Sequence, residues 1–312
     1  MISVAMATYN GENYIEEQLA SIYRQSRKVD EIVISDDASA DGTIAKIQSF
    51  AKNYPDCKIR LFQNESNQGY KRNFQNALSL CEGDIIFLCD QDDVWKRKKV
   101  EVLTEFLEDN PEAALVSSAF TQIDGAGEIV DAHKNVYKKG LPKQVPVSVP
   151  IEDLIFHNIS QGCSMAMRRE IKDRYLQFFT DKLPHDWMIN IVAAMQKKCY
   201  FIDRALFFYR IHEKNTIGLN DTLALQKKNT LQIRSTDAQA AIRVLEFIEA
   251  VDEAYYLRNP QLSDMKHFAR RHVQCLQEKR RKELVLQNFN PYYKKLKTIR
   301  GRMLDIYFVF SK

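Results

Sequence analysis

The sequence of 312 residues lacks several features that define common classes of protein. It contains only 10 glycines and 8 prolines, and it shows no internal repeat and no low-complexity tract, which excludes a fibrous or linker-rich chain. No apolar run approaches the roughly 18 residues that a bilayer-spanning helix needs. The first residues, Met1 to Val4, show no basic region followed by a long apolar region, so no signal peptide is expected.

Cysteine motifs and a dinucleotide fingerprint are absent as well. The six cysteines are scattered and form no CxxC pair, which predicts reduced thiols in the interior of a cytoplasmic protein. The segment after the first predicted strand, residues 8–12, reads Thr-Tyr-Asn-Gly-Glu rather than GxGxxG. This argues against a dinucleotide-dependent oxidoreductase.

Positive charge is concentrated near the C-terminus. The net charge is +4, but residues 266–302 hold twelve Lys or Arg against two acids, which is +10 and leaves the rest of the chain at −6. Such an asymmetry indicates an anionic partner for the C-terminal part of the chain.

Short apolar runs alternate with helical patterns through the first half of the sequence. This alternation predicts a mostly parallel sheet with helices on both faces. The predicted strands are 2–7, 31–34, 59–62, 85–88 and 115–119, and the predicted helices are 14–24, 43–53, 71–81 and 98–109.

The second half changes character near residue 220. Residues 151–220 show mixed strand and helix patterns, whereas the remainder reads as helices over 238–256, 262–286 and 292–310. Asn-Pro pairs at 259–260 and 290–291 break that helical region. We therefore expect an α/β domain over 1–220 and a basic helical region over 221–312.

A polar loop follows each of the first four predicted strands. Ligands of open α/β sheets bind beyond the carboxyl ends of the strands, so these loops should converge on one edge. The loops are residues 8–12, 35–43, 64–69 and 90–93.

Three carboxylates crowd the end of the fourth strand. Asp90, Asp92 and Asp93 follow an apolar run, and their mutual repulsion would be costly without a counter-ion. Mg²⁺ or Mn²⁺ fits, because these ions take oxygen ligands and bridge to phosphates. The alternative is a solvated loop that caps the next helix.

The second and third loops carry groups that suit a nucleotide. Asp36 and Asp37 can accept hydrogen bonds from a base or a ribose, although such a loop can also be a simple turn and cap. Asn67 and Gly69 form a glycine turn, and Arg72 places a cation near the following helix start, where it can meet a diphosphate or remain solvated.

Two residues of the second half could take part in chemistry. Asp186 lies at a predicted helix start, where it is either a general base or an ordinary cap. His212 follows the last predicted strand, where it is either structural or a ligand.

Taken together, the motifs resemble family 2 glycosyltransferases, which have the GT-A fold. The resemblance covers roughly residues 1–215, and its acidic motif is spelled as in bacterial rhamnosyltransferase-like members. It rests on the order and spacing of four segments, 4–10, 35–43, 67–69 and 89–95.

The resemblance implies a role for each matching residue. The nucleoside would be held by Thr8, Tyr9, Asn10, Glu12, Asp36 and Asp37. The ribose, diphosphate and donor sugar would lie near Asn67, Gly69, Arg72, Asp90, Gln161 and Gly162. A Mg²⁺ or Mn²⁺ ion would be bound by Asp92, Asp93 and His212. Asp186 aligns with the catalytic base, although the usual Glu-Asp pair is here His185-Asp186.

The implied activity is an inverting transfer of a sugar from a nucleotide-diphosphate donor to a glycan acceptor, in the synthesis of a bacterial cell-surface polysaccharide. Rhamnose from dTDP-rhamnose is the expected donor by resemblance. UDP-hexose and UDP-N-acetylhexosamine donors stay open, as do a metal-dependent phosphotransferase and an inactive module that binds membrane surfaces.

The expected partners follow from this activity and from the charge. They are the nucleotide sugar and a glycan acceptor that can be lipid-linked; no nucleic acid is expected. For residues 266–302 an anionic membrane surface is one expected partner, and the alternatives are a solvated helix face packed on the catalytic domain and a dimer interface. The expected location is the cytoplasm, with or without peripheral binding to the inner face of the cell membrane.

Overall fold

The computed structural model describes residues 1–134, 137, 141–142, 145–212 and 231–311. The chain forms two compact units, one of Met1–Pro150 with Ile159–Thr216 and one of Ile151–Asn158 with Ile217–Lys312. The domain boundary predicted between residues 220 and 221 lies outside the described residues. Within the described ranges, no helix combines the length and the apolar character needed to cross a membrane.

The first unit is built on a mixed sheet, which has ten strands among the described residues. Their order is β3-β2-β1-β4-β9-β6-β10-β5, with β7 beside β6 and β8 beside β10. The strands are β1 (Ile2–Thr8), β2 (Glu31–Asp36), β3 (Ile59–Gln63), β4 (Ile85–Asp90), β5 (Val94–Trp95), β6 (Leu115–Ile123), β7 (Ile129–Lys134), β8 (Pro146–Ser148), β9 (Met165–Arg168) and β10 (Cys199–Arg210).

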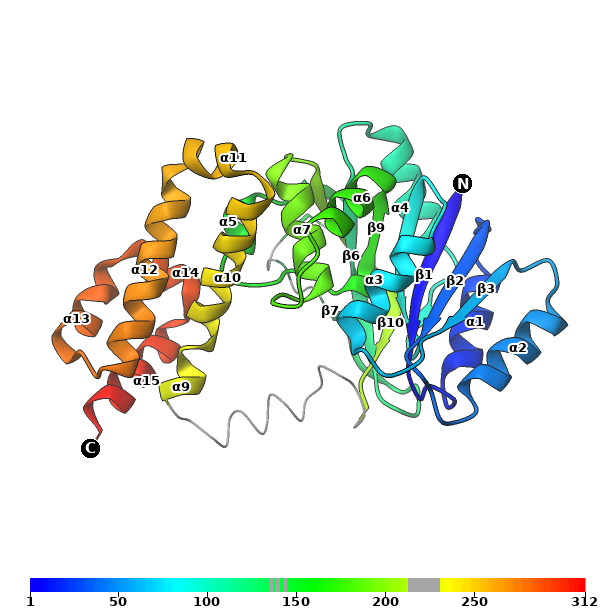
Figure 1. The fold of residues 1–312 in the computed structure, drawn as a ribbon, viewed down its shortest axis with the longest axis horizontal. Coiled ribbons are helices and arrows are strands. Elements are labelled where there is room, and N and C mark those ends of the chain that lie inside the picture. The colour runs from blue at the N-terminus through cyan, green and yellow to red at the C-terminus, as the bar shows by residue number, and fades with distance from the viewer. Residues whose placement is uncertain (135–136, 138–140, 143–144, 213–230, 312) are drawn as a thin grey trace. The chain divides into compact units, whose positions relative to one another are not determined.

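Most of the long strands run in one direction. β3, β2, β1 and β4 are mutually parallel, and β6 is parallel to β10. The short strand β9 lies between β4 and β6 and is antiparallel to both (Figure 1). A strand that follows both neighbours in the sequence is therefore inserted between them in the sheet.

The strand registers bring the polar loops to one edge, as the sequence predicts. Thr8 is paired with Asp36, Asp36 with Gln63, and Ala7 with Asp90, so β1 to β4 end level with one another. The loops that follow these strands consequently lie next to each other at the carboxyl edge.

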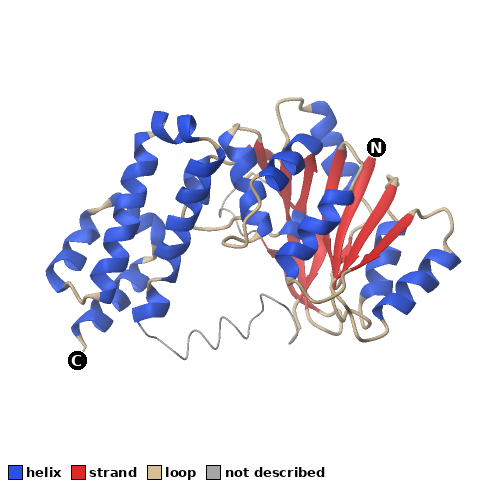
Figure 2. Ribbon diagram, in the orientation of Figure 1, coloured by secondary structure: helices blue, strands red, loops and turns tan. Residues whose placement is uncertain are grey.

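Helices cover both faces of the sheet (Figure 2). On one face, α1, α2 and α4 share a core with alternate residues of β1, β2 and β4. On the other, α3 contacts β1 and β2 and also packs against α6 and α7. The bounds are α1 (Ile15–Tyr23), α2 (Thr43–Asn53), α3 (Tyr70–Leu80), α4 (Lys99–Asp109), α6 (Arg169–Gln177) and α7 (His185–Met195).

The burial pattern explains why these strands read as unbroken apolar runs. In β1, Val4 and Met6 pack against the core that contains Ile15 and Leu19 of α1, while Ala5 is buried on the opposite face. A parallel strand that is covered on both faces has no solvent side, so its sequence does not alternate.

The second unit is helical. Within it, α10 packs along α12, and apolar residues of both helices are buried between them. Its helices are α5 (Ile151–Leu154), α9 (Leu231–Arg234), α10 (Thr236–Val251), α11 (Glu253–Arg258), α12 (Pro260–Gln277), α13 (Arg281–Leu286), α14 (Pro291–Leu296) and α15 (Ile299–Phe310), with a 3-10 turn, η2, at Gln287–Phe289.

The predicted fold class, an α/β fold with a mostly parallel sheet flanked by helices and a C-terminal helical extension, is confirmed. The three long helices predicted in that extension are wrong in detail, because each is divided in two. Asp252 accepts a hydrogen bond from Tyr255 N at 2.8 Å and so begins α11, and Thr298 caps α15 in the same way. Between α12 and α13, Lys279 has a φ of 52°, a left-handed conformation that a right-handed α-helix cannot include, so the two helices are separate.

A buried carboxylate joins three strands at the sheet edge opposite the loops. Glu31, at the start of β2, accepts hydrogen bonds from Ser3 Oγ at 2.7 Å, Glu82 N at 2.8 Å and Arg60 Nη1 at 2.9 Å. Burial opposes its ionisation, but these hydrogen bonds together hold the pKa of Glu31 below its usual value.

We expect Glu31→Gln to lower the free energy of unfolding by about 1–3 kcal/mol, because the amide cannot satisfy the same three donors. The melting temperature should fall by about 2–4 °C for each kcal/mol. Because the folded pKa is depressed, this contribution is present above the unfolded pKa of about 4.3 and is lost as pH falls further. Thermal unfolding measures the effect; the exposed Glu112→Gln should change little, and an equal loss in both variants would contradict the assignment.

Candidate active site

The end of β2 is closed by a buried aspartate. Asp36 accepts hydrogen bonds from Thr8 Oγ1 at 2.8 Å and from both the N–H and the Oγ of Ser39, at 2.8 and 2.6 Å. Between them, Ala38 takes a left-handed conformation with a φ of 61°. The carboxylate of Asp36 therefore shapes the loop from within.

Asp37 connects the second loop to the third. Its carboxylate accepts hydrogen bonds from Asn64 Nδ2 at 2.9 Å and from the N–H groups of Gln68 and Gly69, both at 2.8 Å. Gly69 has a φ of 84°, which glycine adopts without strain, and its N–H also donates to Asn67 Oδ1. Both predicted loop residues thus lie beside Asp37.

The first loop is tied to its neighbours and leaves one aromatic ring exposed. The side-chain amide of Gln91 exchanges two hydrogen bonds with the backbone of Tyr9, at 2.8 and 2.9 Å. Asn10 Oδ1 and Glu12 Oε2 accept hydrogen bonds from backbone N–H groups of residues 38–43, at 2.9 and 2.8 Å. The Tyr9 ring remains exposed and can stack on a base.

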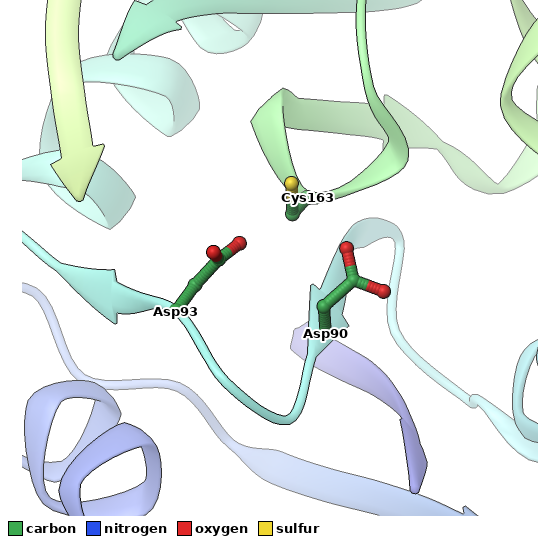
Figure 3. Close-up of side chains that lie close together, drawn as sticks. All are labelled: Asp90, Asp93 and Cys163. Atoms are coloured by element: carbon green, nitrogen blue, oxygen red, sulfur yellow. The ribbon is translucent and has the colours of Figure 1, made fainter. Parts of the chain in front are cut away.

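Beyond β4, two carboxylates and a thiol meet. The ligand atoms of Asp90, Asp93 and Cys163 all lie within 4.8 Å of one another, and Figure 3 shows their side chains directed toward a common space. Cys163 comes from η1 (Gly162–Ser164), directly before β9. Asp93 Oδ1 accepts a hydrogen bond from Arg210 N at 3.1 Å, whereas its buried Oδ2 has no hydrogen-bond partner among the described residues.

The acids of this cluster resist ionisation. Burial, followed by the charge of Asp92, raises the pKa of Asp90 to about 7. The same two causes raise the pKa of Asp93 well above its usual value. Ionisation of these acids is thus unfavourable, and a cation bound beside them would stabilise their ionised forms.

A buried lysine lies beside the acids. Lys99 Nζ donates to the carbonyl oxygen of Cys163 and lies 3.8 Å from the ring centroid of Trp95. Burial lowers the pKa of Lys99 to about 8. The ammonium group therefore balances part of the carboxylate charge from inside the protein.

Strand pairing brings the end of β10 to the acidic loop. β5 pairs with β10 in an antiparallel register, so that Arg210 Nε reaches the carbonyl oxygen of Asp92 at 2.8 Å. His212 Nε2 lies 2.9 Å from Asp92 Oδ2, and the ring of Tyr14 lies 4.8 Å from the His212 ring. The structure thus joins two of the predicted metal residues, Asp92 and His212.

The donor set fits a hard divalent cation. Carboxylate oxygens are the preferred ligands of Mg²⁺ and Mn²⁺, and the buried Asp93 Oδ2 is an acceptor without a donor among the described residues. Cys163 is a poorer candidate, because burial raises the pKa of its thiol well above the usual value and a protonated thiol does not bind metal.

Asp186, the predicted base, lies in the first turn of α7. Its Oδ1 accepts a hydrogen bond from Trp187 N at 2.7 Å. Its charge contributes to the raised pKa values of both Asp90 and Tyr70. The predicted base therefore lies within electrostatic reach of the acidic cluster.

His185 is packed beneath the same edge. Its ring stacks on Phe74 with centroids 4.1 Å apart, and neither ring nitrogen has a hydrogen-bond partner among the described residues. Burial, followed by the charge of Lys71, lowers the pKa of His185 to about 3, so the ring is neutral. A Cβ on Gly162 would lie 2.7 Å from His185 Nε2, which explains the glycine at this position.

The remaining predicted residues are placed differently. Arg72 forms an ion pair with Asp181 and lies 5.8 Å from the ring centroid of Phe179, so a diphosphate would have to compete with that pair. Gln161 Oε1 is buried without a hydrogen-bond partner among the described residues.

Sequence reasoning missed Lys99, and it missed two specific contacts: the hydrogen bonds of Gln91, a member of the predicted loop 90–93, with Tyr9, and the closeness of the Cys163 thiol to the acids. A signal for Lys99 existed, because three acids at the end of a buried strand require a nearby cation. No comparable signal pointed to Gln91 or Cys163, whose roles depend on contacts between distant segments.

Comparison with protein families matches residues 3–175, more than half of the chain, to the family described as Glycosyl transferase family 2. Among curated proteins, the chain is 29% identical over 241 residues to the dTDP-rhamnosyl transferase RfbG of Shigella flexneri. That match covers 74% of this chain and 79% of the relative. The resemblance read from the motifs is confirmed.

Two solved structures with the same fold are complexes with nucleotide sugars. TarS of S. aureus in complex with UDP-GlcNAc has a TM-score of 0.59 at 16% identity, covering 98% of this chain and 89% of that one. The mannosyltransferase PcManGT from Pyrobaculum calidifontis, in complex with GDP-Man and Mn2+, has a TM-score of 0.56 at 19% identity, covering 99% and 87%. At these identities the likeness concerns the fold.

The pKa of Asp90 leads to a pH-dependent prediction. A cation next to this carboxyl favours its ionised form, so the rise in melting temperature caused by Mn²⁺ should be small at about pH 6 and larger at about pH 8. Without metal, the raised folded pKa makes the stability contributed by Asp90 fall as pH increases from about 4 to about 7. Thermal unfolding of the parent and of Asp90→Asn tests both statements. A Mn²⁺ effect in the parent that is independent of pH would contradict the first statement. A metal-free stability difference between the parent and Asp90→Asn that stays constant from about pH 4 to about pH 7 would contradict the second.

Proposed function

The chain belongs to glycosyltransferase family 2, and on that premise we propose that it transfers rhamnose from dTDP-rhamnose to a hydroxyl group of a glycan acceptor. The family assignment makes the protein a nucleotide-sugar glycosyltransferase. The relative from Shigella flexneri, a dTDP-rhamnosyl transferase, supports the choice of donor. The biological setting that we propose is the synthesis of a bacterial cell-surface polysaccharide.

One observation carries the proposal. Asp90, Asp92 and Asp93 stand at the carboxyl edge of the sheet, and the pKa values of Asp90 and Asp93 are raised. The charge of Asp186, on α7, contributes to the raised pKa of Asp90. A site that concentrates carboxylates in this way suits a reaction in which a diphosphate leaves and a hydroxyl group loses its proton.

The donor would lie across the four loops. The exposed ring of Tyr9 offers a stacking surface for the base, while Thr8, Asn10, Glu12, Asp36 and Asp37 hold the surrounding loops in place. We place the ribose and diphosphate between Asp90 and the turn that contains Asn67, Gly69 and Arg72. The donor sugar would face Gln161 and Gly162.

A divalent cation belongs to this proposal. Asp92, Asp93 and His212 would hold Mg²⁺ or Mn²⁺, with the carboxylate of Asp90 beside them. When bound, the ion supplies positive charge that stabilises the leaving diphosphate. The fold neighbour PcManGT, in complex with Mn2+, is consistent with this choice.

Asp186 serves as the general base in this mechanism. Its carboxylate takes the proton of the acceptor hydroxyl while that oxygen forms a bond to the anomeric carbon. The bond from the anomeric carbon to the diphosphate oxygen breaks, and the electron pair leaves with the diphosphate. A single displacement of this kind inverts the anomeric centre.

We also propose where the reaction takes place. The acceptor would be lipid-linked, and the protein would work in the cytoplasm at the inner face of the cell membrane. The net charge of +10 over residues 266–302 supports an anionic membrane surface as a partner.

A panel of nucleotide sugars tests the donor. With Mn²⁺ present, dTDP-rhamnose should raise the melting temperature most, because a ligand that binds the folded state stabilises it. Excess EDTA or the change Asp93→Ala should remove most of this gain, whereas the exposed Asp109→Ala should keep it. A larger gain with a UDP-hexose or UDP-N-acetylhexosamine would show that this sugar nucleotide, not dTDP-rhamnose, is the donor. An undiminished gain in EDTA would contradict the metal assignment.

Replacing Asp186 tests the base. We expect Asp186→Asn to reduce turnover by about 10²–10⁴-fold, with donor affinity nearly unchanged. Steady-state kinetics and donor titration measure the two quantities, and Asp109→Asn on the surface of α4 is the matched control. If Asp186→Asn turned over as fast as the parent, another residue would be the base. No transfer by the parent with any donor would favour an inactive membrane-surface module.

A further inference from the structure

Helix α15 exposes its apolar face. Ile299, Met303, Tyr307 and Phe310 are between 46% and 69% exposed, with successive spacings of four, four and three residues. At 3.6 residues per turn these spacings place all four side chains on one side of the helix. A surface helix of a globular protein normally turns such a face toward the core.

The opposite face of α15 holds a buried charge. Asp305 is fully buried and accepts hydrogen bonds from Tyr293 Oη at 2.7 Å and Lys297 Nζ at 3.1 Å. It also forms an ion pair with Arg234. Rotation of α15 to cover its apolar residues would break this network and leave a buried charge without partners, so the helix orientation is fixed.

The segment of α13 and η2 runs antiparallel beside α15 and adds to the exposed apolar area. The Arg281 guanidinium lies 5.2 Å from the Phe310 ring centroid, and Arg302 Nη1 donates to Asn288 Oδ1 at 3.3 Å. Leu286 and Phe289 of this segment are 64% and 83% exposed. We call the combined face the α13–α15 surface, which consists of Leu286, Phe289, Ile299, Met303, Tyr307 and Phe310.

The cations of residues 266–302 fall into two groups. In the first group the cations have acidic or amide partners: Lys266 pairs with Glu249 at 2.6 Å and Arg270 with Glu246 at 3.3 Å, and the other members are Arg271, Arg280, Lys297 and Arg302. A second group is exposed and has no ion pair among the described residues. Its members lie on or beside α13, α14 and α15, and they are Lys279, Arg281, Lys282, Lys294, Lys295 and Arg300.

We propose that the α13–α15 surface inserts into an anionic lipid bilayer. The inference rests on the proposed function in taking the membrane as the place of the acceptor, and it identifies which face meets it. Exposed apolar side chains next to unpaired cations match the requirements of an interfacial helix. A second copy of the chain fits less well, because it would place the same cations against one another.

Vesicle co-sedimentation of the full chain tests the apolar part. The protein should bind vesicles of phosphatidylcholine with phosphatidylglycerol, and salt should weaken this binding. The double change Met303→Gln with Tyr307→Gln should reduce partitioning by about tenfold or more, because both side chains insert into the interface. Leu257→Gln is the matched control, since Leu257 on α11 is 69% exposed but lies outside the surface.

The charged part has its own matched pair of variants. Lys294→Gln with Lys295→Gln should weaken binding to anionic vesicles, whereas Lys266→Gln with Arg270→Gln, an equal change in charge, should weaken it less. Melting temperatures show whether each variant is folded. The rise in melting temperature caused by dTDP-rhamnose is a separate measure of donor binding. It should be the same in all four variants as in the parent.

Three results would overturn the proposal. They are equal binding to vesicles of phosphatidylcholine alone, no binding to either kind of vesicle, and equal losses in a folded variant and its control. Self-association in sedimentation equilibrium that Met303→Gln with Tyr307→Gln abolishes would assign the surface to a second copy. Because donor binding is measured without lipid, a failure of docking leaves the transferase proposal standing, and a failure of donor binding leaves docking standing.

Discussion

The concentration of negative charge at the end of β4 is the constraint on which the site depends. Asp90 and Asp93 are held in a buried position where ionisation is unfavourable, and Lys99 places a cation beside them from the start of α4. Without that internal cation, the carboxylates would repel one another too strongly to share one edge of the sheet. The negative charge that Lys99 leaves unbalanced favours the entry of a further cation.

The loops around this charge are joined to each other before any ligand arrives. Asp37 fixes the third loop to the second, and Gln91 fixes the first loop to the fourth. Many of the polar side chains at this edge therefore form hydrogen bonds with backbone groups of neighbouring loops. Loops that are already ordered lose little conformational freedom when a ligand binds, which favours affinity and accurate placement of the reacting atoms.

The helical unit follows a different logic. Its stability comes from α10 and α12, whose facing residues form an apolar core, and from the buried network around Asp305. That network fixes α15 in an orientation that leaves its apolar face outside. The same sequence periodicity that normally identifies a core-facing helix here identifies an exposed surface, because the position of one charged residue decides which side is buried.

Local patterns in the sequence were enough to predict the alternation of strands and helices, the polar loops at the strand ends, and the acidic group at 90–93. These features follow from local burial and from the rule that parallel strands end at one edge. No local pattern indicates that Cys163 and Lys99, 64 residues apart, meet at the acids, or that His212 contacts Asp92 across 120 residues. Those contacts depend on the insertion of β9 between β4 and β6 and on the pairing of β5 with β10. Periodicity along the chain reports which side of an element is buried, but it carries no information about which distant strand becomes its neighbour.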